Sequence, residues 1–111
     1  MTNETLETIK SRRSCRAYKP EQITDEELNA VLEAGTYAAS AMGRQSAKIV
    51  VVQDAATRAQ LTRMNAAVMG KDTDPMYGAP TILVVLADAH AANAVPDGSL
   101  VMGNLMLAAA S

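Results

Sequence analysis

Apolar residues recur at two different spacings along the chain, and the change between these spacings predicts the order of its elements. Leu28, Val31 and Leu32 follow the three- and four-residue spacing of one helix face. The stretch 49–52 is continuously apolar and rich in β-branched residues, which is typical of a strand buried on both faces. The predicted helices cover residues 4–11, 25 to about 39, 55 to about 67 and a last stretch opened by Pro96, and the predicted strands cover 48–53 and 81–87.

Capping residues mark two of the predicted helix starts. Thr24 and Glu27 have the spacing of a capping box, and Asp54 precedes the next helix as its N-cap. The last apolar helix, in contrast, reaches Ser111 without a Gly or Asn cap and without a basic last turn. Two strands are also fewer than a stable sheet usually contains. Both features favour the interpretation that the chain is the N-terminal part of a longer domain.

Length and charge restrict the class of protein. A chain of 111 residues fits one small domain, so residues 1–111 are interpreted as a single domain. The net charge of −2 argues against broad nucleic-acid binding, which requires a basic face rather than one local cluster. No apolar run is long enough to span a membrane, and the N-terminus lacks the layout of a secretory signal. A single cysteine cannot form an internal disulfide, which indicates a reducing, cytoplasmic location.

The composition also predicts a core with few large side chains. The chain has seven methionines and three tyrosines but no phenylalanine or tryptophan. We therefore expect part of its apolar surface to be covered by a partner subunit or by a bound ligand.

The segment Arg12-Arg13-Ser14-Cys15-Arg16, called the arginine segment below, is the strongest candidate for binding. Its guanidinium groups pair bidentately with anionic oxygens and stay charged near pH 7. Alternation along an extended backbone would put Arg12, Ser14 and Arg16 on one side, and Arg13 would then face an acid elsewhere. The segment is interpreted as a clamp for a phosphate or for sugar hydroxyls; the alternative is a solvated basic turn.

Two other places carry polar groups suited to a ligand. The loop 40–46 supplies the hydroxyl of Ser40, a cation, and the carboxamide of Gln45, which could recognise the edge of a planar heterocycle. The alternative is an ordinary connection from a helix to a strand. Asn65 and Lys71 could place an amide and a cation near the same ligand, although an exposed helix position is the simpler interpretation of Asn65.

The remaining polar residues give no catalytic set. Asp72 and Asp74 are interpreted as solvated loop acids rather than metal ligands, His90 as a surface residue, and Cys15 as a small core residue. The chain has no P-loop, no G-x-G-x-x-G, no zinc-binding spacing and no nucleophile elbow. Any chemistry is therefore expected to come from a cofactor.

The order and spacing of several short motifs resemble the start of the nitroreductase family, and this resemblance covers essentially the whole chain. The motifs are Ile9-x-x-Arg12-Arg13-Ser14-x-Arg16-x-Tyr18, Ile23-Thr24-Asp25-Glu26-Glu27-Leu28, Ala34-x-x-x-Ala38-Ala39-Ser40, Gln45 before the first strand, Tyr77-Gly78-Ala79-Pro80 before the second, and Gly98-Ser99 with Asn104 in the last helix.

The resemblance implies an α+β fold, a nitroreductase-like three-layer sandwich whose central mixed β-sheet is flanked by helices and which is incomplete at its C-terminus. It implies a homodimer with FMN at the subunit interface, and an oxidoreductase that passes reducing equivalents from NAD(P)H to a nitroaromatic, a quinone or a similar small acceptor. No protein side chain need act as an acid or a base. The FMN-binding positions of the family correspond to Arg12, Arg13, Ser14 and Arg16, to Ser40, Ala41, Met42 and Gln45 from the other subunit, and to Asn65 and Lys71.

The sequence departs from the family pattern in the loop. Ala39 stands where the family usually has proline, Gly43 where it has asparagine, and Ser46-Ala47 where it has Pro-Trp. The family domain also continues beyond position 111. The second hypothesis is therefore a truncated, non-catalytic chain that dimerises or packs with a partner after losing flavin, and the third is an anion- or nucleotide-binding module without redox activity.

Overall fold

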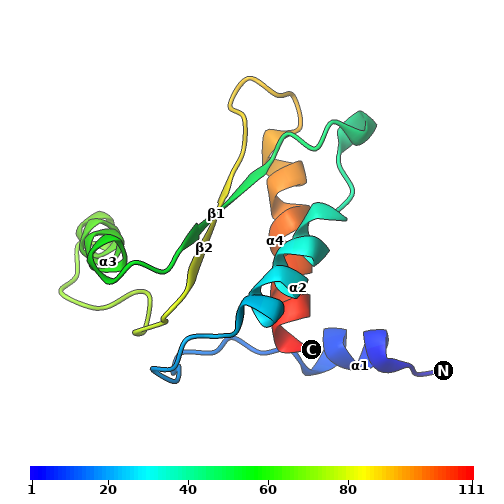
Figure 1. The fold of residues 1–111 in the computed structure, drawn as a ribbon. Helices are drawn as coiled ribbons and strands as arrows, with labels where there is room; N and C mark the ends of the chain where they lie inside the picture. Colours follow the sequence, from blue (N-terminus) through cyan, green and yellow to red (C-terminus); the bar gives the residue numbers. More distant parts are fainter. The chain divides into compact units, whose positions relative to one another are not determined.

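The predicted order of elements is confirmed by the computed structural model, which describes residues 1–111 (Figure 1). The chain forms α1 (Glu4–Ser11), α2 (Asp25–Thr36), the 3-10 turn η1 (Ala41–Gly43), β1 (Lys48–Val52), α3 (Ala55–Met69), β2 (Ile82–Leu86) and α4 (Ala94–Ala110). The predicted α+β class is confirmed, with two antiparallel strands in the sheet. None of the helices combines the length and the apolar composition needed to cross a bilayer.

Helix ends differ from the prediction by a few residues, for local reasons. α2 ends at Thr36 because its last turn tightens, so that the N–H of Tyr37 bonds to the carbonyl of Ala34 at 3.3 Å. α3 continues to Met69 and ends at Gly70, whose left-handed φ of 68° is the usual helix stop. α4 begins at Ala94, since Pro96 in the first turn does not need a backbone donor.

The chain divides into two compact units. Unit 1 comprises Met1–Arg13, Thr24–Ile49 and Val85–Ser111, and so contains α1, α2 and α4. Unit 2 comprises Ser14–Ile23 and Val50–Val84, and so contains α3. Both strands contribute residues to each unit. That residues 1–111 form a single domain stays a prediction.

The core of unit 1 lies between α2 and α4, which run side by side (Figure 1). Leu28 and Leu105 are buried there, with exposed fractions of 8% and 3%. Gly35 allows the close approach, because a Cβ at this position would lie 2.7 Å from Cδ2 of Leu105 and 2.8 Å from Cδ1 of Ile49. The predicted capping box of α2 is confirmed: Thr24 Oγ1 accepts from the Glu27 N–H, and Glu27 Oε2 accepts from the Thr24 N–H.

In unit 2 a polar network holds the extended segment 14–23 against the start of β2. The Gln22 carboxamide donates to the carbonyl of Pro80 at 2.8 Å and accepts from the Thr81 hydroxyl. Gln53, directly after β1, donates to the same Thr81 hydroxyl at 3.0 Å. The predicted N-cap of α3 is confirmed, since Asp54 Oδ2 accepts from the backbone N–H of Thr57 at 2.9 Å.

The prediction of strands buried on both faces is wrong for this chain. Val52 and Ile82 are buried, but Val50 and Val51 of β1 are 41% and 36% exposed and Leu86 is 50% exposed. Successive side chains of a strand point to opposite faces, and both faces are covered only where other elements pack on each. In a sheet of two strands, β-branched side chains of a kind typical of buried strands therefore remain exposed to solvent.

Candidate functional site

The arginine segment begins where α1 ends. Arg12 is the C-cap of α1, with an extended backbone (φ −54°, ψ 136°), and its N–H bonds to the carbonyl of Thr8 at 3.0 Å. Its side chain is half-buried, whereas Arg13, Ser14 and Arg16 are exposed. Arg12 and Arg13 belong to unit 1, and Ser14 and Arg16 belong to unit 2. Because their side chains are exposed, Arg13 and Arg16 present their charges to solvent.

Arg13 does not face an acid, as the sequence interpretation expected. Its Nη1 donates to the carbonyls of Lys10 at 2.7 Å and of Arg12 at 2.8 Å. These carbonyls lie at the C-terminal end of α1, where a cation is favoured by the helix dipole and where backbone acceptors lack helical partners. One nitrogen of Arg13 thus donates to backbone carbonyls at the end of α1 that lack a helical partner.

The prediction that Cys15 is a core residue is also wrong. Its side chain is exposed, and its Sγ lies 3.1 Å from the carbonyl of Ala17. The hydroxyl of Tyr18 donates to the carbonyl of Cys15 at 3.0 Å. Hydrogen bonds between near neighbours therefore shape the second half of the arginine segment.

Residues 40–45, called the glutamine loop below, follow α2 in unit 1 and form a closed structure. Ser40 Oγ accepts from the backbone N–H of Gln45 at 3.0 Å, and Gln45 Nε2 donates to the carbonyl of Thr36 at 3.4 Å. Met42, Gly43 and Gln45 have left-handed φ angles of 54°, 65° and 51°. Such angles are unfavourable for residues other than glycine and are concentrated at functional sites. The structure thus brings two predicted site residues, Ser40 and Gln45, together.

Asp97, which the sequence interpretation missed, holds this loop from α4. Its carboxylate Oδ1 accepts from the backbone N–H of Ala41 at 3.0 Å, and the residue is only 5% exposed. A signal was present in the sequence, because Asp97 is the one charged residue of a mainly apolar helix. A charged residue in such a helix is costly unless it has a specific partner.

Asn65 and Lys71 lie in unit 2, at and beyond the end of α3. Asn65 is exposed on the helix, as in its simpler interpretation, and its Nδ2 donates to the carbonyl of Leu61 at 2.9 Å. Lys71 is exposed and lines a hollow of about 620 Å³ together with Arg63, but Asn65 is not among the lining residues. The structure thus does not bring these two predicted site residues together: Lys71 lines the hollow, and Asn65 bonds to its own helix.

The other polar residues considered in the sequence have local roles. Asp74 is not merely solvated, since its two carboxylate oxygens accept from the backbone N–H groups of Met76 at 2.9 Å and Gly78 at 2.8 Å. His90 is an exposed turn residue, as predicted. No group of three or more His, Cys, Asp or Glu side chains is placed to hold a metal ion.

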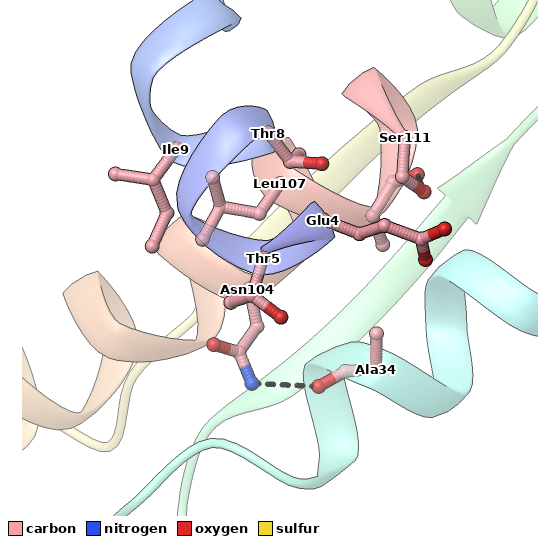
Figure 2. A pocket seen from close by; sticks show the side chains of 9 residues that line it. Glu4, Thr5, Thr8, Ile9, Ala34, Asn104, Leu107 and Ser111 are labelled. Atoms are coloured by element: carbon pink, nitrogen blue, oxygen red, sulfur yellow. Dashed lines mark hydrogen bonds between the residues drawn. The ribbon is translucent and has the colours of Figure 1, made fainter. Parts of the chain in front are cut away.

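A second hollow, of about 390 Å³, lies in unit 1 between α1, α2 and α4 (Figure 2). Asn104 lies beside it and donates from Nδ2 to the carbonyl of Ala34 at 2.8 Å, the bond that the dashed line marks. This bond connects α4 to α2. Asn104, which contributed to the family resemblance, therefore contributes to packing between these helices.

The arginine segment and the glutamine loop both lie within the part of the chain that a family model matches. The model of the Nitroreductase family matches residues 9–111. The chain belongs to the nitroreductase family. A relative from Archaeoglobus fulgidus, with the provisional name NADH dehydrogenase/NAD(P)H nitroreductase, is 34% identical and is aligned over 96% of this chain and 61% of its own length.

Solved nitroreductase structures share the fold. A nitroreductase with bound FMN from Desulfitobacterium hafniense has a TM-score of 0.88 at 31% identity, covering 99% of this chain and 66% of that one. A nitroreductase with bound FMN from Bacteroides fragilis has a TM-score of 0.86 at 34% identity, covering 98% and 65%. The chain thus spans 61% to 66% of the length of these nitroreductase family members.

Proposed function

We propose that the chain contributes an FMN site to an oxidoreductase that transfers reducing equivalents from NAD(P)H to a nitroaromatic, a quinone or a similar small acceptor. The observation that carries the proposal is the exposed arginine segment in a chain of the nitroreductase family. A phosphate ester needs fixed positive charge and several hydrogen-bond donors, and this segment offers both within five residues.

The donor set of the arginine segment fits a phosphate. Arg13 donates from Nη1 to two backbone carbonyls, and the rest of its guanidinium is left for other acceptors. In the proposed arrangement Arg12 and Arg16 neutralise the phosphate, Ser14 donates a hydrogen bond to it, and Arg13 contributes charge from the helix end.

The donors and acceptors of the glutamine loop fit the polar edge of a flavin ring. Gln45 uses Nε2 within the chain, which leaves its Oε1 to accept from a ring N–H. Met42 is 85% exposed and offers an apolar surface, next to the backbone of Ala41 and the hydroxyl of Ser40. Asn65 and Lys71 are proposed as further flavin contacts, an amide and a cation.

In this proposal FMN supplies the hydride chemistry when bound, and the protein binds and orients it. The cationic side chains offset the phosphate charge, and Lys71 favours negative charge on the ring. No side chain of this chain is assigned a proton. NAD(P)H and the acceptor would use one pocket in turn, in a homodimer with FMN at the subunit interface. The single cysteine supports a cytoplasmic location.

The test is a visible absorption spectrum of the purified chain after incubation with FMN and removal of free ligand. We expect retained flavin absorbance and bleaching by NAD(P)H. Riboflavin, which lacks the phosphate, should be retained less well. The nitroreductase from Desulfitobacterium hafniense serves as the positive control. Absence of flavin in the chain beside retention in the control would refute the proposal for these residues.

A second candidate function is a packing partner that does not bind flavin. It is favoured by large exposed apolar side chains, among them Val68 at 89% and Val95 at 76%. Where such side chains form a contiguous patch, the patch often marks a protein interaction site. This candidate predicts oligomers in size-exclusion chromatography together with no flavin in the spectrum, so the same preparation distinguishes the two.

A further inference from the structure

The buried Asp97 is the polar group of unit 1 that the proposed function does not use. It is 5% exposed, it lies in the first turns of α4, and no other charged residue occurs in that helix. A buried carboxylate is tolerated only when hydrogen bonds compensate for lost hydration. Here its Oδ1 accepts from the backbone N–H of Ala41, a residue 56 positions away in the sequence.

The residue after Asp97 packs against the end of β2. Gly98 is buried, and a Cβ there would lie 3.6 Å from the Cβ of Ala87 and 3.8 Å from Cγ1 of Val85. α4 therefore lies beside the end of β2 at this point, and Asp97 belongs to a packed part of the helix. The hydrogen bond thus fixes the loop to the helix.

The loop that receives this bond has an unfavourable backbone. Met42 and Gln45 have positive φ angles without being glycines. Strained angles of this kind persist only where the surroundings determine them from several sides. The bond that the Gln45 N–H donates to Ser40 is exposed and lies within the loop, and the bond that the Gln45 side chain donates to Thr36 is exposed and long. The bond from Asp97 is part-buried and comes from a different element.

We propose that Asp97 is a positioning residue, whose carboxylate holds the glutamine loop in the conformation that presents Met42 and Gln45 to the flavin ring. This inference rests on the proposed function for the identity of the ligand. Asp97 acts through Ala41 and touches neither flavin nor substrate. The proposal predicts two different losses of affinity. A substitution at Asp97 weakens recognition of the ring, whereas a substitution in the arginine segment weakens recognition of the phosphate.

The experiment compares Asp97→Leu, which removes the acceptor, with Asp97→Asn, which keeps an acceptor oxygen. Asn104→Leu is the matched control, because it deletes another α4 side-chain bond to a backbone group, that of Ala34, away from the loop. The first measurement is the hydrogen-exchange rate of each backbone amide, monitored by NMR in the absence of ligand. The second is the affinity of each variant for FMN and for riboflavin.

We expect Asp97→Leu to speed exchange of the Ala41 amide by about tenfold or more, because the variant loses a hydrogen bond to a charged group. Asp97→Asn should stay within about threefold of the native rate, and Asn104→Leu should leave this amide within the same limit. Asp97→Leu should weaken FMN and riboflavin by the same factor, again about tenfold or more, because the loop contacts the ring and not the phosphate.

Equal exchange of Ala41 in Asp97→Leu and Asn104→Leu overturns the proposal, and so does an affinity loss confined to FMN. Should Asp97→Leu fail to fold, the native chain decides, because its Ala41 amide must exchange more slowly than that of Met42. Equal rates there overturn the proposal. If the native chain binds no flavin, the proposed function fails and the presentation of Met42 and Gln45 to flavin fails with it. The exchange rates still decide whether Asp97 holds the loop.

Discussion

The arginine segment and the glutamine loop are proposed to bind two ends of one ligand, but they are held in different ways. The arginine segment is shaped by hydrogen bonds between residues close in the sequence, such as Arg12 to Thr8, Arg13 to Lys10 and Tyr18 to Cys15. The glutamine loop is held by bonds to partners up to 56 positions away. The first is local and exposed, and the second is tied to the core of unit 1.

The difference matches what each region is proposed to recognise. A phosphate presents several charged oxygens, and a long arginine side chain can pair with two of them through its guanidinium fork. A planar ring requires donors and acceptors at set positions, and a loop already fixed before binding loses less conformational entropy when the ring arrives. Preorganisation is therefore placed where geometry carries the specificity.

The largest expected effect separates the phosphate from the rest of the ligand. Arg12→Ala should weaken FMN binding by about 1.5–3 kcal/mol, the usual contribution of a hydrogen bond to a charged group. Riboflavin binding should stay unchanged. Titration of each ligand by quenching of flavin fluorescence measures both affinities. Lys10→Ala is the control, since it removes an exposed positive charge just before the segment; equal losses in the two variants would reduce the role of Arg12 to general electrostatics.

The next effect concerns the packing between α2 and α4 in unit 1. Gly35→Ala should destabilise the chain by about 1–3 kcal/mol, because the new Cβ would overlap Leu105 and Ile49. Gly103→Ala is the matched control, since nothing lies within 4 Å of its Cβ and alanine favours a helix by up to about 1 kcal/mol. Urea unfolding measures both free energies. Similar values for the two variants would mean that α2 and α4 are not in close contact at Gly35.

A smaller effect compares the two regions directly. Ser40→Ala and Tyr18→Phe each delete one hydroxyl that bonds to the backbone, in the loop and in the arginine segment respectively. The half-buried Ser40 should contribute about 1 kcal/mol to the free energy of unfolding. The exposed Tyr18 should contribute less than about 0.5 kcal/mol. Urea midpoints give the order, and a larger loss for Tyr18→Phe would contradict the view that the glutamine loop is the more firmly held of the two regions.

The smallest expected effect concerns Asp54, an exposed carboxylate that can be compared with the buried carboxylate of Asp97. The pKa of Asp54 is lowered from 3.8, mainly because its carboxylate accepts hydrogen bonds from the backbone and the side chain of Thr57. The charged form is thus favoured in the folded state. Its stabilisation is complete above pH 3.8 and is lost as the pH falls through the lowered value.

Asp54→Asn should therefore flatten the acid side of the stability curve slightly. The measurement is the thermal midpoint between pH 5 and the onset of acid unfolding, in the native chain and the variant side by side. A variant that loses stability with acid as steeply as the native chain would show that Asp54 does not contribute.

Much of the fold follows from local patterns in the sequence. The spacing of Leu28, Val31 and Leu32, the capping box at Thr24 and the N-cap at Asp54 each act within a few residues, and each is confirmed. The exposure of Val50 was not predictable, because a buried strand pattern reports the environment for which the residues are suited, not the elements present to cover it.

The candidate site was predictable in part, for the same reason. The charges of the arginine segment are visible in the sequence, but the bonds that Arg13 makes to Lys10 and Arg12 depend on where α1 ends. The bond from Asp97 to Ala41 joins distant positions, and no local pattern encodes it. An isolated acid in an apolar helix is nevertheless a signal that can be used in other chains.

The exposed Cys15 makes the arginine segment accessible to chemical labelling. It is the only cysteine of the chain, and it lies between Ser14 and Arg16. A maleimide fluorophore would therefore attach at one defined position beside the proposed phosphate site. Its emission would report the arrival of a phosphorylated ligand directly, in real time, without the need for flavin absorbance or for turnover.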